Sequence, residues 1–271
     1  MAMQIIPRSL TDDATLTVAP AAVGDLGPEN LQISDRGRVL RVLADAATVT
    51  VTLPQLRRLG GVVLWRHTLS SVGTWRVRAY DDVDGTGVLV YDSGTLAAVP
   101  SKLLGDLDWG VETLGASLAS VDFSSVAFGL VIARSLVIDL TDAGSTLIQV
   151  GRLFAGVPIN LTHNIDWDSA VSWQSETRRQ RTASGGLRVE HEGVYRRLRF
   201  RHQWILPTER AIVADMLRDT GDRAELWISQ WAGEGGRFES DHAMIGFLSD
   251  NPFLTRMRGV RYGTDFDIEE S

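Results

Sequence analysis

The stretch Gly61–Gly94 constrains the fold most, because it contains three expected strands and the two turns that join them. Within it, Thr74–Tyr80 places Trp75, Val77 and Ala79 on one face and Arg76, Arg78 and Tyr80 on the other. A period of two residues is typical of a strand with one buried face. Aspartate and glycine, which favour turns, follow at Asp81–Gly87 and Asp92–Gly94. Such a meander needs a second sheet to cover its apolar face, so the sequence predicts a β-sandwich.

The chain is long enough for two domains, because 271 residues can form two hydrophobic cores. We expect an opening segment over residues 1–30, whose short strand candidates are interrupted by proline and glycine. The β-sandwich is expected over 31–146, with one helical turn at Pro54–Leu59. A second β domain is expected over 147–271, beginning with the β-prone run Leu147–Phe154. The predicted fold class is therefore mainly β.

The second domain has a different character from the sandwich. The polar segment Thr162–Gly186 is too long for an ordinary loop, and we interpret it as an arm that is ordered in an assembly. One α-helix is predicted over about 208–220, because Pro207 suits a helix start and Gly221 stands where a C-terminal glycine belongs. Alternating strands are expected at Tyr195–Trp204 and Val260–Ile268.

The composition and the residue spacing argue against most kinds of catalytic and metal-binding site. The chain has no cysteine, which excludes disulfides, thiolate metal sites and a cysteine nucleophile. Its five histidines lack the spacing of metal ligands, and no nucleophile elbow occurs. Asp166 and Asp168 are a carboxylate pair of the kind that glycan hydrolysis uses, and they leave an enzyme as the third alternative. We predict no enzyme, no metal and no cofactor.

The net charge of −7 disfavours nucleic acid as a partner, and no apolar run is long enough to span a membrane. A local exception is the segment from Arg178 to Arg201, with eight arginines in 24 positions. Such a row of arginines can bind the phosphates of single-stranded nucleic acid, or it can form an interface with an acidic neighbouring subunit. The subunit interface needs fewer assumptions. The candidate interface residues are Trp167, Trp173, Arg178, Arg179, Arg181, Arg197, Arg199 and Arg201.

Aromatic residues beside polar groups in the sandwich loops suit sugar rings, whose apolar faces stack while their hydroxyls form hydrogen bonds. The candidate glycan contacts are Trp65, Arg66, His67 and Trp109. The same tryptophans also suit the core of a sandwich, so both interpretations stay open.

Five short motifs carry a resemblance to a known family. They are His67–Ser71, Thr74–Tyr80, Leu89–Gly94, Trp109–Gly110 and Ile148–Phe154. In this order they resemble the tail-tip structural proteins of tailed bacteriophages, over about the middle third of the chain. The rest of the chain matches only in the order of its elements.

The resemblance implies a jelly-roll-like first domain similar to carbohydrate-binding modules, and a second β domain that joins a ring of tail proteins. It implies a virion protein of the distal tail or baseplate, made in the host cytoplasm. Its partners would be the tail tube, the tail-tip hub, the tape measure protein and further copies of itself, with a host surface glycan as a possible ligand. No catalytic residues are implied. The alternative function is a carbohydrate-binding adhesin.

Overall fold

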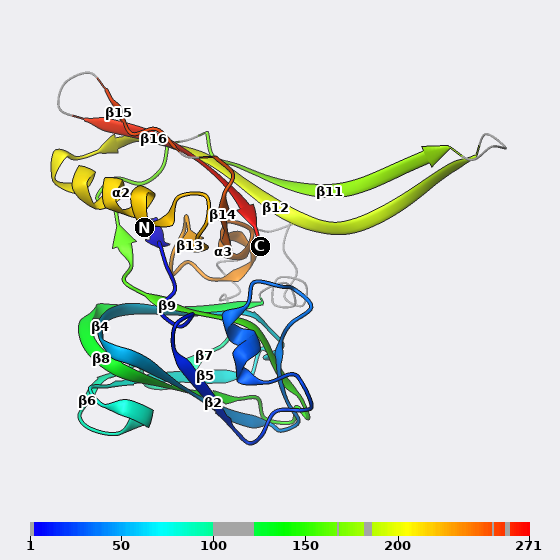
Figure 1. The fold of residues 1–271 in the computed structure, drawn as a ribbon, viewed down its shortest axis with the longest axis vertical. Helices are drawn as coiled ribbons and strands as arrows, with labels where there is room; N and C mark the ends of the chain where they lie inside the picture. Colours follow the sequence, from blue (N-terminus) through cyan, green and yellow to red (C-terminus); the bar gives the residue numbers. More distant parts are fainter. Residues whose placement is uncertain (1–2, 100–121, 167, 182–185, 251, 258–260) are drawn as a thin grey trace, which may run out of the picture. The chain divides into compact units, whose positions relative to one another are not determined.

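The computed structural model describes residues 3–99, 122–166, 168–181, 186–250, 252–257 and 261–271 (Figure 1). The chain forms two compact units. The first contains Met1–Asn160 and Leu226–Met244, and the second contains Leu161–Glu225 and Ile245–Ser271. Both units are built mainly of antiparallel strands, so the predicted mainly β class is confirmed.

The first unit contains most of the strands. They are β1 (Gln4–Ile6), β2 (Thr15–Ala19), β3 (Leu40–Val42), β4 (Ala46–His67), β5 (Thr74–Tyr80), β6 (Leu89–Asp92), β7 (Leu96–Ala97), β8 (Phe123–Thr141), β9 (Ile148–Gly156), β10 (Ile159–Asn160) and β13 (Leu226–Ser229). Its short helices are η1 (Pro28–Gln32), η2 (Val83–Gly85) and α3 (Gly236–Asp241). The main sheet has the order β3-β9-β4-β8-β5-β6, and β2 and β7 pair with β4 and β5.

Two long strands, β4 and β8, give this sheet its two faces. Residues 48–52 of β4 pair with both β2 and β8, whereas residues 61–65 pair with both β9 and β8. The β4–β8 register shifts between Thr52 and Arg57 and again between Leu59 and Gly61. Extra residues at such bulges bend a strand, which lets each long strand contribute to both layers of the sandwich. The helical turn predicted at Pro54–Leu59 is therefore wrong, because these residues belong to β4.

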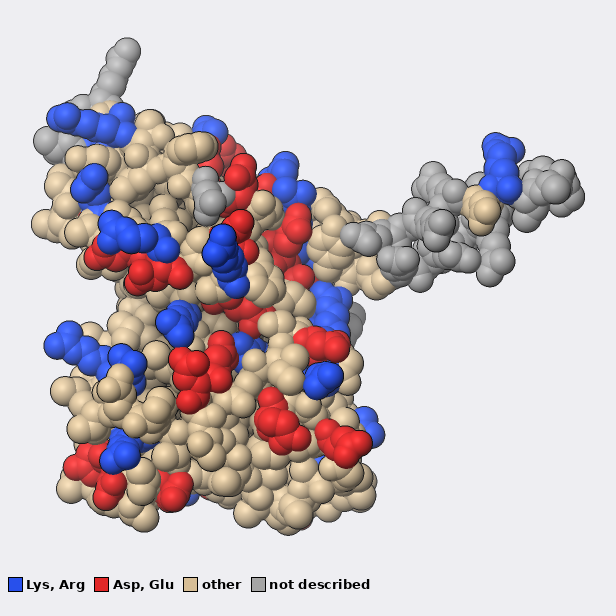
Figure 2. Space-filling view, in the orientation of Figure 1, with Lys and Arg blue, Asp and Glu red and all other residues tan. Residues whose placement is uncertain are grey.

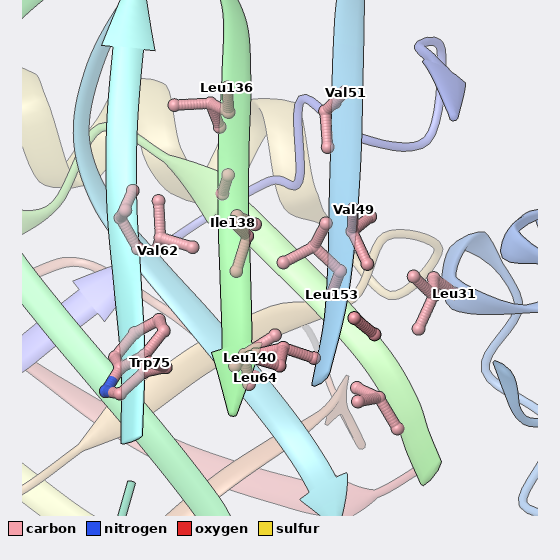
Figure 3. Packing of buried hydrophobic residues seen from close by; sticks show 14 of the residues in the cluster. Leu31, Val49, Val51, Val62, Leu64, Trp75, Leu136, Ile138, Leu140 and Leu153 are labelled. Atoms are coloured by element: carbon pink, nitrogen blue, oxygen red, sulfur yellow. The ribbon is translucent and has the colours of Figure 1, made fainter. Parts of the chain in front are cut away.

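Side chains from both layers fill one core, part of which Figure 3 shows. Val49 and Val51 come from the first half of β4, and Val62 and Leu64 come from its second half. Trp75 packs against the same cluster and is 2% exposed. The predicted inward face of Thr74–Tyr80 is confirmed, because Trp75, Val77 and Ala79 are all buried.

The division into units differs from the predicted boundaries at residues 30 and 146. β9 belongs to the sandwich, because it pairs with β3 and β4. The opening segment is also integrated, since β2 pairs with β4, and β1 pairs with β10 and β13. These partners are distant in sequence, so no local pattern marks the pairing.

The second unit contains β11 (Ala170–Arg181), β12 (Leu187–Ile205), β15 (Thr255–Arg256), β16 (Tyr262–Glu270) and α2 (Pro207–Thr220), together with most of β14 (Ala243–Leu248). β16 is central: it pairs with β12, β14 and β15. The segment predicted as an arm is in large part the strand β11, which pairs with β12 to form a long hairpin (Figure 1).

The predicted helix is α2, which begins at Pro207 and ends before Gly221, whose φ is 51°. Glu209 fixes its first turn. One carboxylate oxygen of Glu209 accepts hydrogen bonds from the backbone N–H and the hydroxyl of Thr162, both at 2.7 Å, and the other accepts from the N–H of Leu206 at 3.0 Å. Burial raises the pKa of Glu209, but these hydrogen bonds outweigh it and hold the pKa below its ordinary value.

Candidate functional site

The hairpin of β11 and β12 extends beyond the sheet that anchors it. β12 pairs with β16 from Arg197 onward, and β11 pairs with β12 from Ala170–Arg199 to Arg181–Leu187. Among the described residues, no third strand pairs with the outer part, which comprises Ser175–Arg181 and Leu187–Val194. We call this outer part the ribbon. An isolated two-stranded hairpin is marginally stable in water, so a surface that covers the ribbon would stabilise it.

Large apolar side chains are exposed where the ribbon begins. Trp173 on β11 is 59% exposed and Val194 on β12 is 54% exposed. Arg181, at the outer end of β11, is exposed as well. Exposed aromatic and arginine side chains are frequent at the centres of protein interfaces. Trp173 and Arg181 therefore stay predicted interface residues, and Val194 is added to them as a candidate.

Other predicted interface residues are described only in part or not at all. Trp167 lies outside the described residues. The backbone of Arg178 is opposite Glu190, and that of Arg179 is opposite Val189. The side chains of both arginines lie outside the described part of the structure.

The arginine row at the base of the hairpin already has acidic partners within the same chain. Arg197, Arg199 and Arg201 on β12 are in register with Glu269, Asp267 and Asp265 on β16. Asp267 accepts hydrogen bonds from Arg197 at 2.6 and 2.8 Å and from Arg199 at 2.6 Å, and Asp265 accepts one from Arg201 at 2.7 Å. The prediction that this row meets an acidic neighbouring subunit is thus corrected: the acidic neighbour is β16.

These ion pairs have clear electrostatic effects. The hydrogen bond to Asp267 raises the pKa of Arg197. Burial raises the pKa of Asp267, but the hydrogen bonds from Arg197 and Arg199 outweigh it, so the pKa lies below its ordinary value. In Figure 2, basic and acidic groups lie next to one another on the face in view, and neither sign forms a broad patch there. The pairing of Arg197, Arg199 and Arg201 with carboxylates disfavours phosphate binding by these three residues.

The opposite face of β12 is buried from Leu198 to His202, as its alternation predicts, whereas Trp204 on the same predicted face is 40% exposed. Leu198, Phe200 and His202 are at most 3% exposed, and the ring of Phe200 stacks on that of Phe266 at 4.8 Å. Arg196 begins this face and pairs with Glu270, which accepts its hydrogen bonds at 3.1 and 3.2 Å. The base of the hairpin is therefore held by both packing and charge, in contrast to the ribbon.

A groove of about 640 Å³ lies beside this base, in the second unit. Residues of β12, β15 and β16 line it together with Asp168 and the segment around Phe253. Phe253 is 83% exposed and Met257 is 37% exposed, so the groove offers apolar surface to a ligand. Its described charged lining residues are Asp168, Asp250, Asp265, Asp267, Arg199 and Arg201, which gives four negative and two positive charges and a net charge of −2.

Of the predicted glycan contacts in the first unit, Trp65 and His67 lie in its interior. Trp65 is 1% exposed, and its ring lies 5.7 Å from that of Phe123 and 5.5 Å from that of Trp227. A sugar therefore has no access to Trp65, and the alternative interpretation as a core residue describes it. Trp109 lies outside the described residues.

His67 is also buried, at 5% exposure. The hydroxyl of Ser124 donates to the carbonyl of Ala98 at 2.6 Å, so its oxygen is left to accept from Nε2 of His67 at 2.7 Å. Burial lowers the pKa of His67 to about 4, which keeps the ring neutral near pH 7. Arg66 is only partly buried, and its φ of 54° is an unusual backbone conformation for a residue with a side chain.

No group of histidine, aspartate or glutamate side chains in the described residues is arranged to hold a metal ion. Within the same residues, no helix is both long and apolar enough to cross a membrane.

No protein-family model and no curated protein matches the chain. Solved structures with partial similarity include chitosan-binding module 1 from a chitosanase/glucanase of Paenibacillus sp. IK-5, at 11% identity and a TM-score of 0.39 over 55% of this chain and 98% of that one. A fucose-binding module of Streptococcus pneumoniae has 14% identity and a TM-score of 0.39, over 55% and 94%. A family 32 carbohydrate-binding module of C. perfringens in complex with galactose has 13% identity and a TM-score of 0.38, over 55% and 97%. Since TM-scores of this size reflect only partial superposition, the ligands of these modules are not transferred to this chain.

Proposed function

We propose that this protein is a structural subunit of a larger assembly, which it joins through the ribbon of β11 and β12. The observation that carries the proposal is the ribbon itself, a two-stranded extension with no third strand among the described residues. A bare strand edge presents unpaired backbone groups, and proteins usually cover, shorten or blunt such an edge. Docking on a neighbouring subunit would satisfy those groups and bury Trp173, which is 59% exposed.

The setting of the assembly forms part of the same proposal. The motifs between His67 and Phe154 resemble tail-tip structural proteins, so we propose the distal tail of a virion as the location. The partners would then be the tail tube, the hub, the tape measure protein and further copies of this chain. The role is non-enzymatic. Labelling of purified virions with an antibody against the chain, followed by electron microscopy, tests the setting: label elsewhere than the tail tip contradicts it.

Shortening the ribbon tests the role. Replacement of residues 176–193 by Asn-Gly would join Ser175 to Val194, which face each other in the register, through a two-residue turn. We expect the wild-type chain to form oligomers by light scattering and the shortened chain to be monomeric. The thermal unfolding midpoint should be nearly unchanged, because no third strand among the described residues pairs with the part that is removed. A shortened chain that keeps the wild-type mass contradicts the proposal.

A second candidate function is glycan binding at the surface of the first unit, as in an adhesin. The observation in its favour is the φ of 54° at Arg66, because strained backbone is more frequent at binding sites than elsewhere. Binding of the wild-type chain to an array of bacterial glycans, lost on Arg66→Ala, would support this candidate. Arg57→Ala, also on β4 and exposed, is the matched control. An array on which wild-type protein binds nothing contradicts it.

A further inference from the structure

The bend of the sandwich, where β4 and β8 pass from one layer to the other, has an apolar outer surface. Arg58 of β4 is opposite Ile132 of β8 there. Leu56, Leu130 and Ile132 are 54%, 59% and 56% exposed. The side chain of Leu130 lies over β4 at Gly60, where a Cβ atom would come within 3.0 Å of it. The outer face of a sandwich is normally polar, so exposed aliphatic side chains on two paired strands indicate a surface that another molecule covers.

Three arginines lie beside these side chains. Arg57 and Arg58 are exposed and Arg134 is partly buried, and none of them forms an ion pair with a described carboxylate. The side-chain oxygen of Gln55, in the amide orientation that satisfies its hydrogen bonds, accepts from Arg57 at 2.6 Å, but Gln55 is neutral. β4 contains no acidic residue, and the single acid of β8, Asp139, forms its ion pair elsewhere. We call Leu56, Arg57, Arg58, Leu130, Ile132 and Arg134 the bend patch.

A surface of matching chemistry lies in the turn that joins β5 to β6. Asp81, Asp82 and Asp84 are exposed there, and Val88 and Leu89 are 64% and 46% exposed. The three carboxylates accept hydrogen bonds from backbone N–H groups and a threonine hydroxyl, and none forms an ion pair with a described cation. Residues 81–91 include no basic residue. We call Asp81, Asp82, Asp84, Val88 and Leu89 the acidic turn.

The two surfaces are neighbours on the first unit, but they do not cover each other. Ser135 follows Arg134 on β8, and its hydroxyl donates to the carbonyl oxygen of Asp82 at 2.6 Å and accepts from the N–H of Gly85 at 2.9 Å. These bonds hold the acidic turn on β8 beside the bend patch, and Figure 1 shows β4, β8 and β6 at the same side of this unit. Both surfaces are nevertheless exposed, so a second molecule is needed to bring such surfaces together.

We propose that the bend patch of one copy of this chain binds the acidic turn of a second copy, while the acidic turn of the first copy binds the bend patch of the second. Aliphatic side chains would be buried against one another, and arginines would meet carboxylates, with which they form strong hydrogen bonds. A two-fold axis makes such a contact self-complementary. This inference rests on the proposed assembly role, to which it adds a contact between first units.

The contact is expected to be weak by itself, because each surface is a short stretch of strand or turn. It would add to the contact of the ribbon once two copies are already joined, since joining raises the effective concentration of the second pair of surfaces. The shortened chain should therefore stay monomeric at concentrations at which wild type is oligomeric.

A charge exchange tests the proposal in the full-length protein. The patch variant carries Arg57→Glu and Arg58→Glu, and the turn variant carries Asp82→Arg and Asp84→Arg. Asp81 is left intact, because it accepts a hydrogen bond from the backbone of the turn. Sedimentation velocity over a series of concentrations should show each variant alone associating at least about tenfold more weakly than wild type, because like charges then face one another. An equimolar mixture should regain the wild-type strength, since every patch then has a turn of opposite charge.

Three controls complete the design. Arg218→Glu and Arg223→Glu change the net charge as much as the patch variant does, at exposed arginines outside both surfaces, and should leave the association unchanged. Leu130→Gln tests the apolar part of the patch and should weaken the association without any change of charge. Asp84 has a φ of 53°, which arginine tolerates less well than aspartate, so thermal unfolding checks the turn variant. If the turn variant does not fold, the patch variant and Leu130→Gln decide.

The outcomes separate this inference from the role on which it rests. If the shortened chain is monomeric while the patch variant associates as wild type does, the ribbon role stands and this inference is overturned. If the patch variant dissociates while the shortened chain keeps the wild-type mass, the bend patch is a self-association surface and the ribbon role fails. A mixture of folded variants that does not regain the wild-type strength also overturns the inference, as does a wild-type chain that is monomeric at every concentration.

Discussion

The sandwich core and the ribbon differ in what stabilises them. In the first unit, apolar side chains from distant strands share one interior, and residues such as Val49, Leu64 and Ile138 are at most 1% exposed. Where the hairpin leaves its base, the described apolar side chains of Trp173 and Val194 are more than half exposed. Burial of apolar surface is the main favourable contribution to folding. The sandwich therefore contains its own stabilisation, whereas Trp173 and Val194 would contribute more if another surface covered them.

The base of the hairpin lies between these extremes. Its inner face is apolar, and its outer face consists of ion pairs between β12 and β16. Exposed ion pairs contribute little to stability, but like charges facing one another would oppose the pairing of the strands. The comparison shows that matched charges accompany the register at the base, while a large apolar core dominates the sandwich. The ribbon, which pairs with no third strand among the described residues, is the part that we expect a partner to complete.

The largest expected effect contrasts two tryptophans. Trp65→Ala should lower the free energy of unfolding by about 3–5 kcal/mol, because a large aromatic side chain leaves a cavity between Phe123 and Trp227. Trp173→Ala should change it by less than about 0.5 kcal/mol, because its ring is already exposed. Urea unfolding followed by far-UV circular dichroism measures both. Equal effects of the two substitutions would contradict the distinction between the sandwich core and the exposed hairpin.

A pH effect of intermediate size is expected in the sandwich. His67 has a pKa of about 4 in the folded state and an ordinary value of 6.5 when unfolded. The unfolded chain therefore binds the extra proton first, and stability falls as the pH decreases from 6.5 to about 4. The loss approaches about 3 kcal/mol for this one group.

Unfolding titrations across that pH range, on wild type and His67→Gln, test the effect. The variant should be less stable at pH 7 but should lose less stability between pH 6.5 and 4. If the free energy of unfolding falls equally with pH in wild type and His67→Gln, groups other than His67 cause the acid sensitivity.

Local patterns in the sequence predict the strands that have one buried face. Thr74–Tyr80 agrees with β5 in both bounds, because alternation and flanking turns are local properties. β4 could not be predicted at its full length. Pro54 suggests a break, but the strand has a register shift there, and an irregular pair does not require the backbone N–H that proline lacks.

The sites were less predictable than the strands. Trp65 is a core residue because Trp227, from a distant part of the chain, packs against it, and neighbouring residues do not reveal such a contact. The pairing of β12 with β16 did leave a signal. Arginines alternate at 197, 199 and 201, and acids alternate at 265, 267 and 269, as two strands of one sheet with matched charges would require. Comparing the alternating faces of all predicted strands for opposite charge would have found it.

The smallest expected effect separates two ion pairs at the base of the hairpin. Asp267→Asn removes a half-buried carboxylate that accepts hydrogen bonds from both Arg197 and Arg199, and should cost about 2 kcal/mol at pH 7. Asp265→Asn removes an exposed partner of Arg201 and should cost less than about 1 kcal/mol. The two substitutions are chemically identical and two residues apart on β16, so each is the control for the other.

The pKa of Asp267 determines how the stability difference between wild type and Asp267→Asn changes with pH. Because the pKa of Asp267 in the folded state lies below its ordinary value of 3.8, the contribution of Asp267 to stability is complete above pH 3.8 and is lost as the pH falls through the folded pKa. The stability difference between wild type and Asp267→Asn should therefore shrink in acid. If Asp265→Asn lowers the stability as much as Asp267→Asn does, solvent exposure does not determine how much these ion pairs contribute to stability. The whole row of ion pairs, rather than one half-buried carboxylate, would then stabilise the base of the hairpin.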